Sequence, residues 1–173
     1  MSAGGDITGT SSNSTGIVVG MQSTIMRAKG DIKGIVTNTS EVYSPGIAFG
    51  GIGGDPPGSG GPTAPEGATV ISCGNISGTG YYGVSFFNFT NVYVKKKIKG
   101  QSSDTIHSIV SYDCLPSVKT GEGLSANGKK GYYTDSITYF RCTGNDLGGD
   151  DWIFIPDSLE ENGYIPEWCQ QNP

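Results

Sequence analysis

The chain has 173 residues and a formal net charge of −5, and only 16% of its residues are charged, which excludes disorder by self-repulsion and predicts one globular domain. It contains 16 Ile and 10 Val against 4 Leu and 6 Ala, and Gly and Pro together make up 38 residues. β-Branched residues favour strands, and Gly and Pro favour turns, so this composition excludes a helix bundle and predicts an all-β protein. No apolar run is long enough to span a bilayer.

Residues 1–100 contain an internal repeat of two elements. The first is the pentapeptide Gly-Asp/Asn-Ile-x-Gly, and the second, Gly-Ile/Val-x-Val/Phe, follows each copy of it. The pentapeptides begin at Gly5, Gly30 and Gly74, and the second elements begin at Gly16, Gly46 and Gly83. The Gly/Pro-rich stretch 50–67 lengthens the second interval, and we predict that it is an inserted loop, because it has no β-branched run that could form a strand.

Weaker copies of the repeat follow downstream, where residues 109–114 lead to 123–126 and residues 138–142 lead to 152–154. This alignment places Cys73, Cys114 and Cys142 at one phase of the unit, each directly after a short strand.

A unit of 20–30 residues with two or three short strands cannot cover its own apolar face, and stacking of successive units buries that face. We therefore predict parallel pairing between consecutive coils, about 4.8 Å apart, with glycines at corners that need a positive φ. The expected stacks are Ile7, Ile32 and Ile76 in one, Ile17, Ile47 and Val84 in a second, and Asp6, Asp31 and Asn75 at a corner.

With this spacing, segments 70–84 (VISCGNISGTGYYGV) and 137–154 (ITYFRCTGNDLGGDDWIF) resemble the pectin-lyase-like parallel β-helix, over about residues 5 to 155. Pectinolytic enzymes, phage tailspikes and surface adhesins use that fold. The resemblance implies an all-β, single-stranded right-handed parallel β-helix of about five irregular coils. Residues 1–155 would form the coils, with the loop 50–67 inserted, and 156–173 a C-terminal capping segment. An antiparallel β-sandwich is the competing architecture.

The C-terminal segment breaks the repeat, and we expect its large apolar residues to lie over the last coil as a cap. These residues are Leu159, Tyr164, Ile165 and Trp168. Cys169 could form a disulfide that ties this segment to Cys142 or to another coil, and the alternative is that the cysteines are free or stacked thiols. A zinc site is not expected, because the chain has no CxxC pair and a single His, His107.

An acidic cluster near the C-terminus carries the candidate chemistry: Asn145, Asp146, Asp150, Asp151 and the adjacent Trp152. Paired carboxylates can act as general acid and base in glycoside cleavage, and Asp146, Asp150 and Asp151 are the catalytic candidates if the protein is an enzyme. They resemble the Asp-Asp pairs of pectinolytic β-helix hydrolases. The same oxygens could bind Ca²⁺, which is the one cofactor left open, or form an ordinary Asx-rich turn.

Aromatic and amide side chains supply the candidate ligand-binding residues, which are Tyr81, Tyr82, Asn88, Tyr132, Tyr133, Asn145 and Trp152. Alternation along a strand would send one ring of each tyrosine pair inward and the other outward. Outward rings with amides suit a glycan, a subunit interface or plain surface packing.

The one basic run is Lys95–Lys99, apart from Ile98. We expect a solvated strand or turn that protects a sheet edge, with contact to an acidic partner as the alternative, including the acidic C-terminus of a neighbouring copy. A sequence pI near 4.7 argues against nucleic acid.

Together these features predict a non-enzymatic structural or adhesive module of a virion, tail fibre or cell surface that binds a glycan or a neighbouring protein. It would be extracellular or virion-associated and homo-oligomeric, with no nucleic-acid or membrane partner. The alternative is a small polysaccharide-degrading glycosidase or lyase. Residues 1–20 show no secretion signal, so the chain either is made in the cytoplasm or begins after a removed leader.

Overall fold

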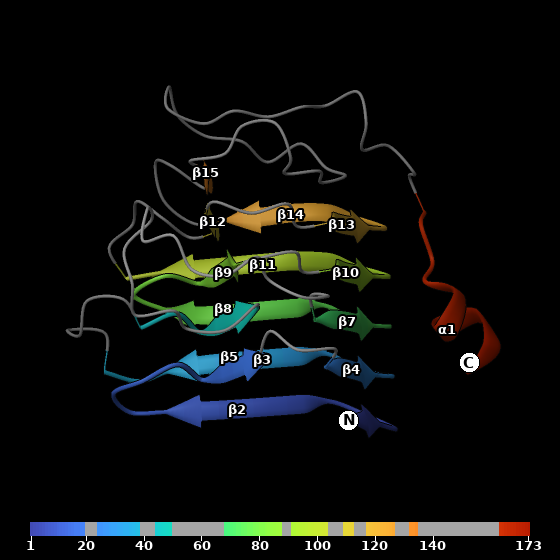
Figure 1. Ribbon diagram of the computed structural model, residues 1–173, viewed down its shortest axis with the longest axis horizontal. Helices are drawn as coiled ribbons and strands as arrows, with labels where there is room; N and C mark the ends of the chain where they lie inside the picture. The colour runs from blue at the N-terminus through green and yellow to red at the C-terminus, as the bar shows by residue number, and fades with distance from the viewer. Residues whose placement is uncertain are drawn as a thin grey trace, which may run out of the picture.

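The computed structural model describes residues 1–19, 24–38, 44–49, 68–87, 91–103, 109–112, 117–126, 132–134 and 163–173. The fifteen strands in these ranges form three sheets of five strands each, and every strand pair among them is parallel. The chain contributes one strand to each sheet in turn and then begins the next coil, so five coils lie on top of one another (Figure 1). The predicted parallel β-helix is confirmed, and the antiparallel sandwich is wrong.

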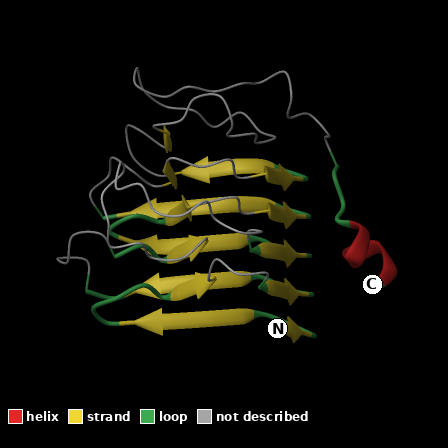
Figure 2. Ribbon diagram, in the orientation of Figure 1, coloured by secondary structure: helices red, strands yellow, loops and turns green. Residues whose placement is uncertain are grey.

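The sheets are named A, B and C in the order in which a coil visits them. Sheet A contains β1 (Ser2–Ala3), β4 (Ile25–Ala28), β7 (Thr69–Ser72), β10 (Asn91–Val94) and β13 (Ser117–Thr120). Sheet B contains β2 (Ile7–Ser11), β5 (Ile32–Val36), β8 (Ile76–Gly80), β11 (Lys97–Ser102) and β14 (Gly123–Ala126). Sheet C contains β3 (Ile17–Val19), β6 (Ile47–Phe49), β9 (Val84–Phe87), β12 (Ile109–Tyr112) and β15 (Tyr132–Thr134). The described helix is α1 (Glu167–Gln171), at the C-terminal end (Figure 2).

The predicted aliphatic stacks form the core. In sheet B, Ile7 pairs with Ile32 and Ile32 with Ile76, and Ile98 extends the stack to the fourth coil. In sheet C, the stack is Ile17, Ile47, Val84 and Ile109. Most of these side chains are completely buried. Each buried Ile or Val contributes about 1.5–3 kcal/mol to the stack, so the repeated β-branched positions are the main source of its stability.

The phase predicted for the first downstream copy, residues 109–114 with 123–126, is wrong by one strand, and the second copy, 138–142 with 152–154, lies outside the described residues. Residues 109–112 pair with Val84–Phe87 of sheet C, and Gly123–Ala126 pair with Lys97–Gly100 of sheet B. The fourth copy of the pentapeptide is therefore residues 96–100, in which lysines replace the leading Gly-Asp while the Ile and the final Gly remain. Cys73 follows β7 of sheet A, whereas Cys114 and Cys142, which the sequence placed at the same phase, lie outside the described residues.

The repeated glycines are required for close approach of two backbones, and the prediction of a positive φ at the corners is wrong. Gly163, with φ of 84°, is the one positive-φ glycine in the described ranges. A Cβ on Gly34 or Gly78 would overlap the carbonyl oxygen of Gly46 or Gly83, which lies across the interior of the same coil. The interior is therefore too narrow at this level for any side chain, because the chain entering sheet C passes directly over sheet B.

Candidate functional site

The corner between sheets A and B holds the predicted stack of Asp6, Asp31 and Asn75, which we call the Asx ladder. The Asp31 N–H donates to Asp6 Oδ1 at 2.8 Å, and the Asn75 N–H donates to Asp31 Oδ1 at 2.8 Å. The Lys97 N–H lies 3.4 Å from Asn75 Oδ1 and continues the pattern into the fourth coil. Each side-chain oxygen thus satisfies a backbone donor of the coil above, which explains the short polar residue at this position.

Lys33 supplies positive charge beside the ladder. Its Nζ lies 3.3 Å from Asp31 Oδ2 and 3.8 Å from Asp6 Oδ2. Burial raises the pKa of Asp31, but hydrogen bonds from Asn75 and the charge of Lys33 outweigh it, so the pKa lies below its ordinary value. Asp31 is therefore ionised at neutral pH, and Lys33 partly neutralises its charge.

Four lysines surround the same corner in the fourth coil: Lys95, Lys96, Lys97 and Lys99, which we call the lysine corner. Backbone hydrogen bonds hold it on the third coil, with the Lys95 N–H donating to the Ser72 oxygen at 2.9 Å and the Lys96 N–H to the Gly74 oxygen at 3.2 Å. Lys97 is half-buried and the other three are exposed. Within the described ranges none of the four forms an ion pair, since the salt bridges there are those of Lys33. Among the described residues, the lysine corner is therefore a set of cations without an anionic partner, on a backbone that is hydrogen-bonded to the third coil.

β11, which carries two of these lysines, is an interior strand between β8 and β14. The expectation of a solvated segment is confirmed, but the expectation that it protects a sheet edge is wrong. Edge protection therefore does not explain the lysines, because the backbone groups of β11 are paired on both sides.

The outer face of sheet B continues the lysine corner as a polar surface. One row across the coils consists of Thr8, Lys33, Ser77 and Lys99, and the next of Thr10, Ile35, Thr79 and Gln101. These side chains are half-buried or exposed. Hydroxyl, amide and ammonium groups thus recur on a parallel sheet at the coil spacing of about 4.8 Å.

Residues 163–173, which we call the strap, lie along the outer face of sheet A beside the coils and not over the end of the stack (Figure 1). The Gly163 N–H donates to the Gly121 oxygen of the fifth coil at 3.2 Å. Further on, the ring of Trp168 lies 5.9 Å from the Arg27 guanidinium of the second coil. The expectation that Tyr164, Ile165 and Trp168 cover the last coil is therefore wrong, and Leu159 lies outside the described residues.

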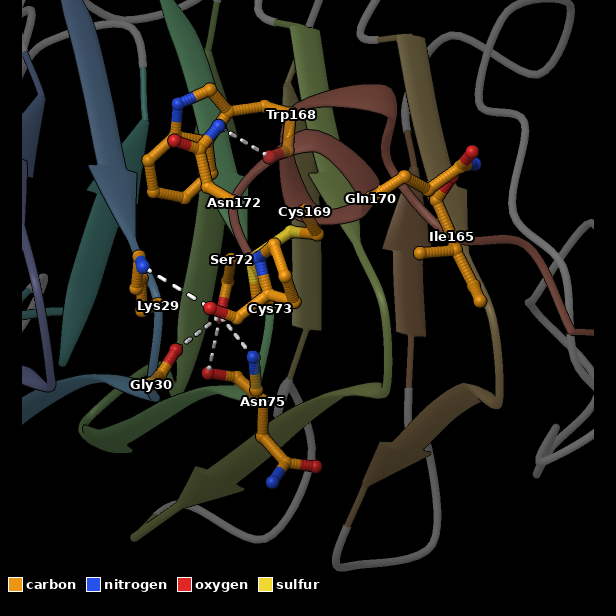
Figure 3. Close-up of a disulfide and its surroundings, with 12 residues drawn as sticks. Lys29, Gly30, Ser72, Cys73, Asn75, Ile165, Trp168, Cys169, Gln170 and Asn172 are labelled. Atoms are coloured by element: carbon orange, nitrogen blue, oxygen red, sulfur yellow. Dashed lines mark hydrogen bonds between the residues drawn. A yellow bond between two sulfur atoms is a disulfide. The ribbon is translucent and has the colours of Figure 1, made fainter.

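A disulfide joins Cys169 of the strap to Cys73, at the corner of the third coil, with the Cα atoms 5.6 Å apart (Figure 3). The sequence left three alternatives for Cys169: a disulfide to Cys142, a disulfide to another coil, or a free or stacked thiol. The structure has the second, because Cys73 belongs to the third coil. Cys142 itself lies outside the described residues. The sequence signal for Cys73 was its position directly before the third pentapeptide, where the side chain faces outward.

Aromatic and cationic contacts accompany the disulfide. Lys119 Nζ lies 5.7 Å from the centre of the Tyr164 ring, and that ring lies 6.4 Å from the ring of Tyr93. Lys29 Nζ donates to the Pro173 oxygen at 3.2 Å. The strap thereby contacts the second to fifth coils in turn, and nothing in the repeat pattern indicated it.

Tyr81 and Tyr82 lie at the bend between β8 and β9, on the opposite corner of sheet B. Their rings pack against each other at 5.0 Å and 79°, and both side chains are half-buried. The expected alternation of one inward and one outward ring is wrong here, because the pair is not in a strand. Tyr132 and Tyr133 belong to β15, opposite Ile109 and Val110 in sheet C, and are not part of this corner.

The remaining candidates, Asn88, Asn145, Asp146, Asp150, Asp151 and Trp152, lie outside the described residues. Within the described part of the chain, no group of three or more His, Cys, Asp or Glu is placed to hold a metal ion. The same part contains no helix with the length and apolar character needed to cross a membrane. A scan against protein-family models and searches of curated proteins and of solved structures found no match to the chain.

Proposed function

We propose that this protein is a rigid, non-enzymatic binding module of a virion, tail fibre or cell surface, and that its lysine corner binds an acidic glycan. The observation that carries the proposal is the set of four lysines on one coil that form no ion pair within the described part of the chain, beside a polar sheet face. Carboxylate or sulfate groups of a glycan would neutralise the ammonium groups, and its hydroxyls would hydrogen-bond to the Ser, Thr and Gln side chains of sheet B.

The composition of this surface favours a glycan over a protein partner. Protein interfaces are enriched in aromatic side chains and depleted in Lys, whereas the outer rows of sheet B contain one aliphatic residue, Ile35, among hydroxyl, amide and ammonium groups. The overall pI of about 4.7 does not suit nucleic acid. A local basic surface on an acidic protein instead favours an anionic ligand that contacts only a few of the protein's charges.

The disulfide supports an extracellular or virion-associated location, because disulfides persist in oxidising environments. Assembly into a homo-oligomer is part of the proposal. β1, β2 and β3 are the terminal strands of their sheets, and residues 1–19 contain no Lys, Arg or Pro that would hinder further pairing. Val18 in β3 and Ile25 in β4, each 44% exposed, add apolar surface to the outer faces of the first two coils. Sedimentation at several concentrations tests assembly, and a strict monomer would contradict it.

The binding proposal is tested with the double variant Lys96→Gln, Lys99→Gln, which removes two cations and keeps most of each side chain. Its affinity for a polyuronate, measured by calorimetry at low salt, should fall about 5- to 30-fold, because each exposed charge pair contributes about 0.5–1 kcal/mol. Added salt should weaken wild-type binding more than binding by the variant. The matched control, Ser12→Asp with Ser103→Asp, changes the net charge equally at exposed positions across sheet B and should bind like wild type.

Three results would overturn the proposal. An equal loss in the control would mean that net charge and not the lysine corner determines binding. Equally tight binding of poly-glutamate would assign the surface to an acidic protein. Release of reducing ends or unsaturated products from the polyuronate would show that the module is an enzyme. A sulfated glycan and an uncharged glucan, measured in parallel, separate sulfate from carboxylate recognition and establish the requirement for charge.

A further inference from the structure

The strap occupies a surface whose chemistry matches that of the lysine corner. By register, one outer row of sheet A consists of Arg27, Ile71, Tyr93 and Lys119. Without the strap, this row would present two cations with an aromatic ring between them. Tyrosine rings stack on the apolar faces of sugars, and cations bind their acidic groups, so the row has the groups that an acidic glycan requires.

This row is continuous with the lysine corner. The neighbouring outer row contains Lys29, Cys73 and Lys95, because the Cys73 N–H donates to the Ala28 oxygen and the Lys95 N–H to the Ser72 oxygen. Lys95 therefore belongs both to the lysine corner and to the edge of the surface under the strap. A ligand that binds the lysine corner could extend over sheet A without a gap if the strap were absent.

Aromatic rings of the strap contact the cations of this surface, in the place that a ligand would occupy. The ring of Tyr164 lies against Lys119, and the ring of Trp168 lies against Arg27. Its own polar groups are paired largely within the strap, since Gln170 Nε2 donates to the Ile165 oxygen and Asn172 Nδ2 to the Trp168 oxygen. The strap is therefore a compact unit that can leave sheet A with its internal hydrogen bonds intact.

The disulfide is the covalent link between this unit and the coils. The bond joins α1 to the third coil (Figure 3), and there Cys169 is 7% exposed and Cys73 is half-buried. Because Cys73 lies beside Lys95 in the register of sheet A, the bond lies at the boundary between the strap and the lysine corner. A dithiol would reduce it in two exchange steps. One thiolate of the dithiol attacks a cysteine sulfur and releases the other cysteine as a thiol, and the second thiolate then releases the first cysteine. The products are two protein thiols and the oxidised dithiol.

We propose that the outer face of sheet A beneath the strap is a latent second subsite for the acidic glycan, opened when a dithiol reduces the Cys73–Cys169 disulfide. The inference rests on the proposed function of the lysine corner, which it extends. In an oxidising environment the strap covers the subsite, and the lysine corner alone binds. In a reducing environment Arg27, Tyr93 and Lys119 become available, and the contact with the glycan lengthens.

The test measures polyuronate affinity of the oxidised protein, of the protein reduced with a dithiol, and of the variant Cys169→Ser. Reduction and the variant open the strap independently, and circular dichroism checks that both proteins keep their strand content. Each should bind about tenfold more tightly than the oxidised protein. Arg27→Gln with Lys119→Gln should abolish this gain in the opened protein and leave binding by the oxidised protein unchanged.

Equal affinity of the opened and oxidised proteins, or a gain that survives Arg27→Gln with Lys119→Gln, would overturn this inference and leave the proposed function intact. Failure of all forms to bind the polyuronate would overturn the proposed function itself. Binding by the opened forms alone would refute the lysine corner as the primary site and keep the surface under the strap as the binding site.

Discussion

Replacing both Cys73 and Cys169 with Ser is expected to lower the free energy of unfolding substantially. The disulfide closes a loop with a sequence separation of 96 residues. In the chain-entropy model, a loop of this length restricts the unfolded chain by about 16 cal/mol/K, which corresponds to about 4.7 kcal/mol at 25 °C. This figure is the upper limit, because the variant can also release the strap in its folded state. The corresponding fall in Tm is about 9–19 °C for a chain of this size.

Urea denaturation followed by circular dichroism measures the effect, with the wild-type protein in the presence of reductant as the control. The reduced wild type and the double variant should unfold at the same urea concentration. Each single variant should lose as much as the double variant, because either one removes the same bond. A double variant within about 0.5 kcal/mol of the oxidised wild type, or alkylation of both cysteines without reductant, would refute the reasoning.

Two further predictions test the interior and the Asx ladder. Gly78→Ala should destabilise the fold by about 3 kcal/mol in urea denaturation, because its Cβ would overlap the Gly83 carbonyl. The control Gly4→Ala should be nearly neutral, because nothing lies within 4 Å of a Cβ at that position. Similar losses of stability in the two variants would contradict the close-approach explanation. Asp31→Asn keeps the ladder acceptor and removes the charge. Because the pKa of Asp31 is lowered in the folded state, the ionised carboxylate stabilises the fold. This stabilisation is fully present above the unfolded-state pKa of about 3.9 and is lost as the pH falls through the folded-state pKa. The variant should therefore lose less stability than the wild type in that acid range, and parallel pH profiles of the two proteins would contradict this.

The repeat alone was sufficient to predict the stacking of coils. Ile7, Ile32 and Ile76 recur with the same neighbours, and in a parallel stack equivalent residues lie directly above one another. The ladder position of Asp31 follows from the same rule. A repeating sequence determines its contacts in this way because each coil contacts only the coils before and after it. The candidate site was partly visible, since the run Lys95–Lys99 stood out as the one basic segment.

The tertiary structure decided the features that the period does not determine. The lysine run belongs to an interior coil, because Ile98 and Gly100 keep the core positions although the residues before them changed. The partner of Cys169 lies 96 residues away, and the strap follows the side of the stack. The contacts of the strap depend on which surface of the coils fits a segment that is remote in the chain. Local propensities and the repeat spacing describe only neighbouring residues and neighbouring coils, so they do not determine these contacts.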